Sequence, residues 1–180
     1  MSKVAAVLIA ALVALSLAAT VSAGSVHLKG GKNATPSFVD NGLSLTASGE
    51  LAGLGNGDVL VTIDATADVT ANCTHPGDQS KGPGQNPAPI SVTGSVSIPA
   101  SEIKNGNTPF SVATTAPPSS IPGAPDCPNP GWSENILDLA FTSATITVEQ
   151  PAGNVVLVVS CTFSPATSDS PVSKADVSCT

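Results

Sequence analysis

The sequence predicts an all-β protein that folds as an antiparallel sandwich of two sheets. The first observation is the segment 58–77, in which apolar residues hold nearly every odd position and polar residues nearly every even position. This alternation is typical of a strand with one buried and one solvated face. The second observation is that turn signals recur at short intervals, whereas no long window shows a helical period. Many short strands joined by polar turns favour a sandwich over a mixed fold.

The chain supplies four strands before the first long loop. A short strand is expected at 26–28, and the Asn-Gly pair within 38–45 predicts a type I′ hairpin with Phe38 opposite Leu45. The glycine-rich segment 53–57 is a turn that leads into the long strand of segment 58–77.

Two loops rich in proline and glycine, 75–89 and 116–131, interrupt the chain. We expect no regular structure in either of them. Between them, 90–98 alternates as a strand, Asn105-Gly106 marks a turn, and 110–115 is a short strand.

Three more strands follow the second loop. The segment 136–148 changes its apolar phase midway, which indicates a bulge or a switch between sheets. The segment 155–163 is the most apolar after the N-terminus and is expected to be a central strand, and 174–179 is the last strand. The whole is expected to be immunoglobulin-like in general architecture, although Trp132 lies beside a loop rather than between two bridged cysteines in mid-strand.

The N-terminus reads as a secretion signal. Lys3 is followed by an apolar run, and Val21-Ser-Ala23 is a small-residue cleavage site. The apolar run is shorter than the roughly 20 residues that a spanning helix needs. We therefore expect residues 1–23 to be a signal peptide and 24–180 to be a single secreted, extracellular β-sandwich domain of 157 residues (180 minus 23).

The charge of the chain excludes one class of partner. The sequence has 13 acidic residues against 6 lysines and no arginine, with a net charge of −7. Nucleic-acid binding requires a clustered basic surface, so no nucleic-acid partner is expected, and no membrane contact is expected after signal cleavage. Acidity itself indicates solubility and names no partner.

Four cysteines in an exported chain predict two disulfides. Cys73 and Cys127 open similar Cys-x-x-Pro-Gly turns, and Cys161 and Cys179 would lie opposite each other if the chain folded back near Ser170. We therefore predict the pairs Cys73–Cys127 and Cys161–Cys179. The alternative joins Cys73 to Cys161, because both end inward-facing runs.

Four short motifs carry a resemblance that covers the whole mature chain. They are Ala52-Gly-Leu-Gly-Asn56, Pro83-Gly-Gln-Asn-Pro87, Ile98-Pro-Ala-Ser-Glu-Ile103 and Ala124-Pro-Asp-Cys-Pro-Asn129. In these motifs the chain resembles a group of small secreted bacterial β-sandwich proteins of unassigned function. The resemblance implies a secreted, disulfide-bonded β-domain and transfers no site.

Few residues offer chemistry. His27 is expected to be exposed, and His75 could join Cys73 in a metal site only if that thiol were free, so we expect no metal and no cofactor. No nucleophile motif accompanies His75. Asp64 and Asp68, four residues apart on one strand, would be roughly 13 Å apart, too far for a glycosidase pair.

These observations predict a secreted non-enzymatic structural or interaction domain. The candidate binding surface is the end of the domain where Cys73–Cys127 would join the two loops, with His75 and Trp132 beside them. The partner would be an extracellular protein or a glycan. One alternative is a carbohydrate-binding module that presents Trp132, although the interpretation favoured for this tryptophan is that it caps the core beneath the proline-rich loop. A second alternative is a small secreted hydrolase that uses His75.

Overall fold

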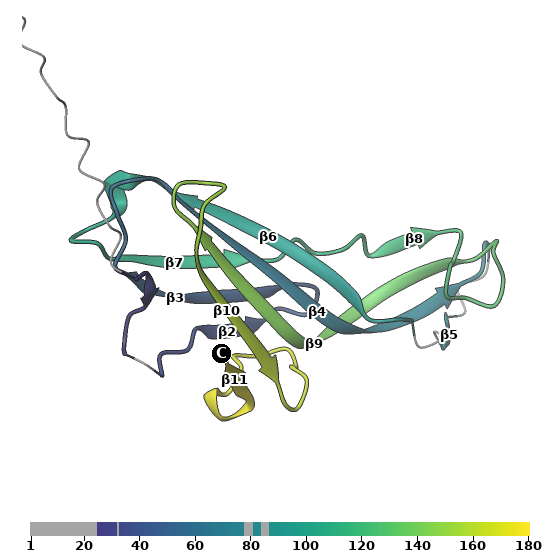
Figure 1. Cartoon of the computed structure of the whole chain (residues 1–180). Coiled ribbons are helices and arrows are strands. Elements are labelled where there is room, and N and C mark those ends of the chain that lie inside the picture. The colour runs from purple at the N-terminus through teal and green to yellow at the C-terminus, as the bar shows by residue number, and fades with distance from the viewer. Residues whose placement is uncertain (1–24, 32, 78–80, 84–86) are drawn as a thin grey trace, which may run out of the picture.

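The computed structural model describes residues 25–31, 33–77, 81–83 and 87–180, and the predicted signal peptide lies outside them. The described chain is all-β, with two packed antiparallel sheets (Figure 1). The strands, in chain order, are β1 (His27–Leu28), β2 (Ser37–Asp40), β3 (Leu45–Ala52), β4 (Val59–Thr74), β5 (Lys81–Pro83), β6 (Ile90–Ile98), β7 (Thr108–Ala113), β8 (Ser120–Pro122), β9 (Ser133–Glu149), β10 (Val155–Phe163) and β11 (Val177–Cys179). Two 3₁₀ turns, η1 (Ala100–Glu102) and η2 (Lys174–Asp176), are the helical elements of the described residues, and neither is long and apolar enough to cross a membrane.

The smaller sheet is organised around β3. Strand β7 pairs with one side of β3, while β1 and β2 lie one after the other along its opposite side. The larger sheet has the order β11-β10-β9-β4-β6, and β5 and β8 extend it at the far ends of β4 and β9. The two-sheet sandwich predicted from the sequence is therefore confirmed.

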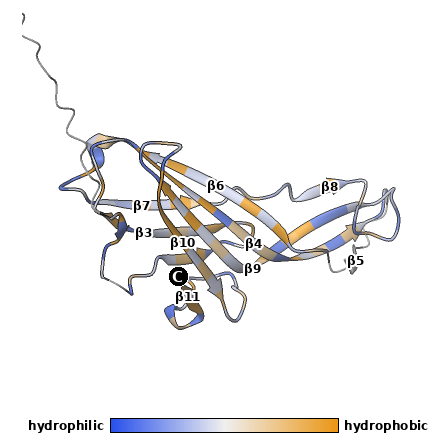
Figure 2. Cartoon of the chain, viewed as in Figure 1, coloured by the Kyte–Doolittle hydropathy of each residue, from blue (hydrophilic) through white to orange (hydrophobic). Residues whose placement is uncertain are grey.

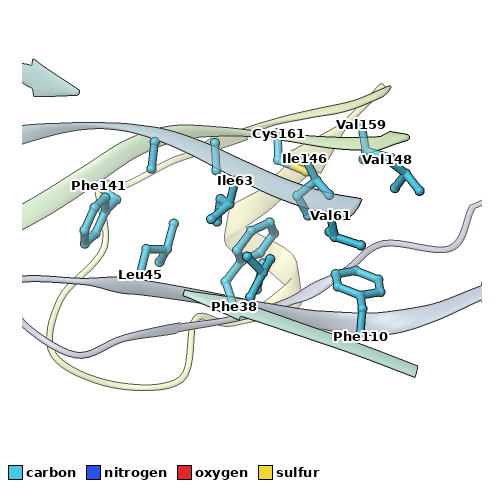
Figure 3. Close-up of a cluster of buried hydrophobic side chains, with 14 of the residues drawn as sticks. Phe38, Leu45, Val61, Ile63, Phe110, Phe141, Ile146, Val148, Val159 and Cys161 are labelled. Atoms are coloured by element: carbon cyan, nitrogen blue, oxygen red, sulfur yellow. The ribbon is translucent and has the colours of Figure 1, made fainter. Parts of the chain in front are cut away.

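The core lies between the two sheets and follows from the alternation of the strands. Figure 2 shows hydrophobic and hydrophilic residues alternating along β4 and β6. Every odd position of β4 from Val59 to Ala67 is buried, as the pattern of segment 58–77 predicts. In Figure 3 the inward side chains of β4, β9 and β10 face those of β2, β3 and β7. Phe38 and Phe163 pack edge to face there, with ring centroids 5.0 Å apart.

One side of the sandwich is closed by direct contact between β6 and β7. The N–H of Thr115 donates to the carbonyl oxygen of Thr93 at 2.8 Å. Gly94 permits this approach, because a Cβ atom built on it would lie 1.8 Å from the carbonyl oxygen of Ala113. The glycine inside β6 is therefore required by packing rather than by a turn.

The opposite side is closed over part of its length by the segment 164–173. The N–H of Val172 donates to the carbonyl oxygen of Phe38, and the N–H of Asp40 donates to that of Ser170. This segment thus extends β2 of the smaller sheet and leads through η2 into β11 of the larger one. No described segment closes the same side between β1 and the first half of β10.

Several details of the sequence prediction are wrong. Phe38 pairs with Ala47, not Leu45, because the Asp40 side chain accepts a hydrogen bond from Gly42 N and opens a four-residue loop in place of a type I′ turn. The predicted loops contain β5 and β8, which gain partners at the ends of β4 and β9. The first half of β10 is an edge rather than a central strand, since β11 pairs only with Cys161–Phe163.

Candidate functional site

The two longest strands continue beyond the sandwich as an arm. Strand β6 accompanies β4 only as far as Ala67, and β10 accompanies β9 only from Ser143 onward. Beyond these points β4 and β9 pair with each other as far as Thr74 and Ser133, with β5 and β8 added at the outer end. We define the arm as residues 68–74 and 133–141 with β5 and β8 (Figure 1, right).

Two bulges shape the arm where it leaves the sandwich. The register of β4 on β9 shifts between Thr66 and Ala67 and again between Thr70 and Ala71. Bulges bend a strand and increase its twist, which is consistent with the change of phase predicted for 136–148. The arm therefore leaves the sandwich as a twisted ribbon.

A disulfide holds the end of the arm together. Cys73 on β4 is bonded to Cys127, with Cα atoms 5.9 Å apart, and Cys161 is bonded to Cys179 in the body of the sandwich. Both predicted pairs are confirmed, and the Cys73–Cys161 alternative is wrong. Cys127 lies in the loop 123–132 between β8 and β9, so its bond ties this loop to the opposite strand.

His75 and Trp132 meet at this end. His75 follows β4 directly and is exposed, and Trp132 precedes β9 and is half-buried. Their rings pack edge to face with centroids 5.6 Å apart and an interplanar angle of 84°. We define the tip as residues 75–77 with the loop 123–132. Trp132 is thus part of the tip and does not cap the core of the sandwich, so the favoured expectation of a core cap is wrong.

The indole nitrogen of Trp132 is an unusual feature of the tip. Nε1 is buried and has no hydrogen-bond partner among the described residues. A buried donor without a partner costs free energy, about 1–3 kcal/mol in proteins. An acceptor supplied from outside the described chain would relieve that cost.

Glu134 is a second such feature, and the sequence analysis missed it. It is only 2% exposed, its Oε2 has no partner among the described residues, and its strand neighbours are Cys73 on β4 and Ile121 on β8. Burial raises the pKa of the Glu134 carboxyl, and the negative charge of Asp126 raises it further. The sequence held one signal for this burial. Glu134 is two residues before the buried Ile136, so both side chains lie on the same face of the strand.

The other face of the arm carries a small amide and hydroxyl network. The side-chain nitrogen of Asn135 donates to Asn72 Oδ1 at 3.2 Å and to Thr74 Oγ1 at 2.8 Å. These cross-strand bonds connect β9 to β4 near the disulfide. They fix the pairing of the two strands at the point where His75 and Trp132 emerge.

A separate polar cluster lies in the body and joins the two sheets. The Thr167 hydroxyl donates to Asp40 Oδ2 and accepts from the N–H of Phe141 at 2.8 Å. Burial raises the pKa of the Asp40 carboxyl, while its hydrogen bonds from Thr167 and Gly42 act in the opposite direction. Every bond in this cluster is internal, so we assign it to stability rather than to ligand binding.

The remaining candidate residues do not join the tip. His27 lies on β1 in the body and is exposed, as predicted. Asp64 and Asp68 both point outward from β4 and are exposed. The Cys73 thiol is consumed by the disulfide, and in the described part of the chain no group of three or more His, Cys, Asp or Glu side chains is arranged to bind a metal.

Comparisons with protein-family models, with curated proteins and with solved structures give no match for this chain.

Proposed function

We propose that this chain is a secreted extracellular interaction domain without catalytic activity, which binds its partner through the tip of the arm. The observation that carries the proposal is the construction of the tip. An exposed His75 and a half-buried Trp132 stand in contact at the end of a projecting arm, and a disulfide secures them. The two disulfides also suit an oxidising extracellular compartment.

The tip has the properties expected of a binding surface. Its aromatic anchor is already ordered by the His75 ring and by the bond from Trp132 N to Asn129 O, so little conformational entropy is lost on binding. The unpartnered Trp132 Nε1 and Glu134 Oε2 supply one donor and one acceptor that a partner could satisfy after a small adjustment of the loop 123–132. An extracellular protein segment fits these features best.

A glycan is the second candidate partner, and it is favoured by Trp132 alone. Sugars stack on exposed indole faces, whereas the Trp132 ring is half-buried and carries His75 against it. The hydrolase alternative has less support, because among the described residues His75 has no hydrogen bond that would orient it as a general base.

The proposal is tested by measuring the binding of fluorescently labelled mature protein to the cells that secrete it. The test variant combines His75→Ala with Trp132→Ala, and the matched control combines Ser101→Ala with Glu102→Ala in the exposed η1 turn at the other end of β6 and β4. We expect the tip variant to lose at least about ten-fold in affinity, equivalent to about 1.4 kcal/mol, and the control to bind as wild type.

Equal binding of the two variants would contradict the proposal, as would the absence of any binding by the wild type. A glycan array with the same proteins identifies the class of partner. Selective glycan binding that Trp132→Ala abolishes would establish the carbohydrate-binding alternative in place of a protein partner.

A further inference from the structure

A second surface, in the body and apart from the arm, carries an independent inference. A groove of about 480 Å³ lies between β1 of the smaller sheet and β10 of the larger one. Its lining is mainly apolar, chiefly Leu28, Ala34, Leu157 and Val159, and it also includes His27 and Thr180. This is the stretch of the sandwich that the segment 164–173 leaves open.

The backbone of β10 is unpaired along this groove. Ser160 and Thr180 exchange both of their backbone hydrogen bonds, so Ser160 directs its N–H and C=O toward the β11 side. Strand alternation then directs the N–H and C=O of Val158 to the same edge. The described strands give β10 only β9 as a partner over Val155–Val159, so these groups of Val158 meet no neighbouring strand.

The edge also lacks the features that normally protect one. Val155 and Val158 are 55% and 50% exposed, and β10 contains no lysine, proline or inward charge over these residues. Natural edge strands are usually shielded by such residues, by bulges or by a covering segment. The bulge between Val155 and Leu157 protects only the start of the strand.

We propose that this groove accepts an extended segment of a partner protein, which adds to β10 as a strand. Unpaired backbone donors and acceptors recognise another backbone, and the apolar wall beside them receives the alternate side chains of that segment. The free edge runs from the turn at 150–154 to Thr180, so it accommodates about five residues of an extended chain at about 3.3 Å each.

The lack of acidic and lysine side chains in the described lining of the groove indicates which kind of segment it can accept. The described lining contains no Asp, Glu or Lys side chain, so the inserted residues are expected to be uncharged and β-branched at the inward positions. A second copy of this chain fits less well, because both copies carry a net charge of −7 and each β11 obstructs the approach of a second β10 edge.

The test uses a synthetic heptapeptide of alternating threonine and valine, with acetylated and amidated ends. The matched control is the same peptide with its alternate backbone nitrogens methylated, which removes strand pairing while keeping the side chains. We expect the parent peptide to slow hydrogen exchange of the Val158 amide and to bind at least about ten-fold more tightly than the methylated control.

Two variants locate the binding. Val158→Pro removes the free N–H without removing a bond to β9, and Ala34→Phe fills the groove without altering β10. We expect each variant to weaken peptide binding at least about ten-fold, and Leu137→Ala, an equally exposed apolar residue on the arm, to leave it unchanged.

Three results would overturn the inference. The first is unchanged exchange of the Val158 amide at millimolar peptide. The second is equal binding of the parent and methylated peptides, which would make the groove a site for a compact apolar molecule. The third is a dimer in analytical ultracentrifugation with Val158 protected in the absence of peptide, which would assign the edge to a second copy.

Discussion

Removal of the Cys73–Cys127 disulfide is expected to separate the unfolding of the arm from that of the sandwich. The perturbation is the double variant Cys73→Ser with Cys127→Ser. In the chain-entropy account, a bond that spans 54 residues stabilises a fold by about 4 kcal/mol, and one that spans 18 residues by about 3 kcal/mol. Of the largest fully buried side chains, only Leu139 and Phe141 lie in the arm, so the arm has little core of its own.

The assay exploits the single tryptophan, which lies at the tip. In thermal unfolding of the variant, we expect the Trp132 fluorescence transition to occur at a lower temperature than the far-ultraviolet circular dichroism transition, because the tip unfolds before the sheets. The control is Cys161→Ser with Cys179→Ser in the body. In this control the transition temperatures from both probes should fall together, by roughly 6–12 °C for a loss of about 3 kcal/mol.

A coincident drop of both transitions in the Cys73→Ser, Cys127→Ser variant would refute this reasoning. Such a result would mean that the arm and the sandwich unfold as one cooperative unit. The tip would then be stabilised by the core rather than by its disulfide, and flexibility at the tip could not be altered independently of the fold.

Three further predictions concern the body. Gly94→Ala drives a methyl group into a backbone carbonyl of β7, so it should lower the free energy of unfolding, measured by chemical denaturation, by about 3 kcal/mol. Gly57→Ala, whose added methyl group would make only ordinary contacts, should lower it by less than about 1 kcal/mol. Thr167→Val should cost about 3 kcal/mol because it leaves two buried partners unsatisfied, while the exposed Thr162→Val should change stability by less than about 0.5. Because the pKa of Asp40 is raised, this carboxyl contributes most to the free energy of unfolding in acid. That contribution is lost as the pH rises from the ordinary pKa of 3.8 through the pKa in the folded state. Asp40→Asn should flatten this part of the pH profile of stability measured by urea titration, and an unchanged slope would contradict the prediction.

Most of the fold could be predicted from the alternation of apolar and polar residues in the sequence. In segment 58–77 one residue in two is apolar, and a strand with that pattern can be buried on only one face, so its role in a sandwich could be predicted. The Cys73–Cys127 pair was predicted from local signals too, because matching Cys-x-x-Pro-Gly turns mark two chain reversals.

Other features depend on contacts between distant segments, which periodicity does not report. Strands β5 and β8 consist of only three residues each and exist because the ends of β4 and β9 offer them free edges. The strongly apolar β10 reads as a central strand, yet its first half lies at an edge because β11 is short. The polar cluster of Asp40, Thr167 and Phe141 also joins residues that lie far apart in the sequence.

The candidate site was predicted in part. His75 and Trp132 were expected near one end of the domain, and the structure brings their rings together. Glu134 was not identified because a single acid beside a proline-rich loop resembles a solvated charge. Its strand neighbours are Ile121 of β8 on one side and Cys73 of β4 on the other, and β8 was not expected.

Site-specific photo-crosslinking tests the central claim of tip binding most directly. A benzophenone amino acid is placed at the exposed Pro76 in the tip and, as a control, at the exposed Ser101 at the other end of the domain, and each protein is illuminated on the cells that secrete it. The proposed function predicts one discrete crosslinked species from position 76 and none from position 101. Crosslinks from position 101 alone, or the same species from both positions, would contradict it.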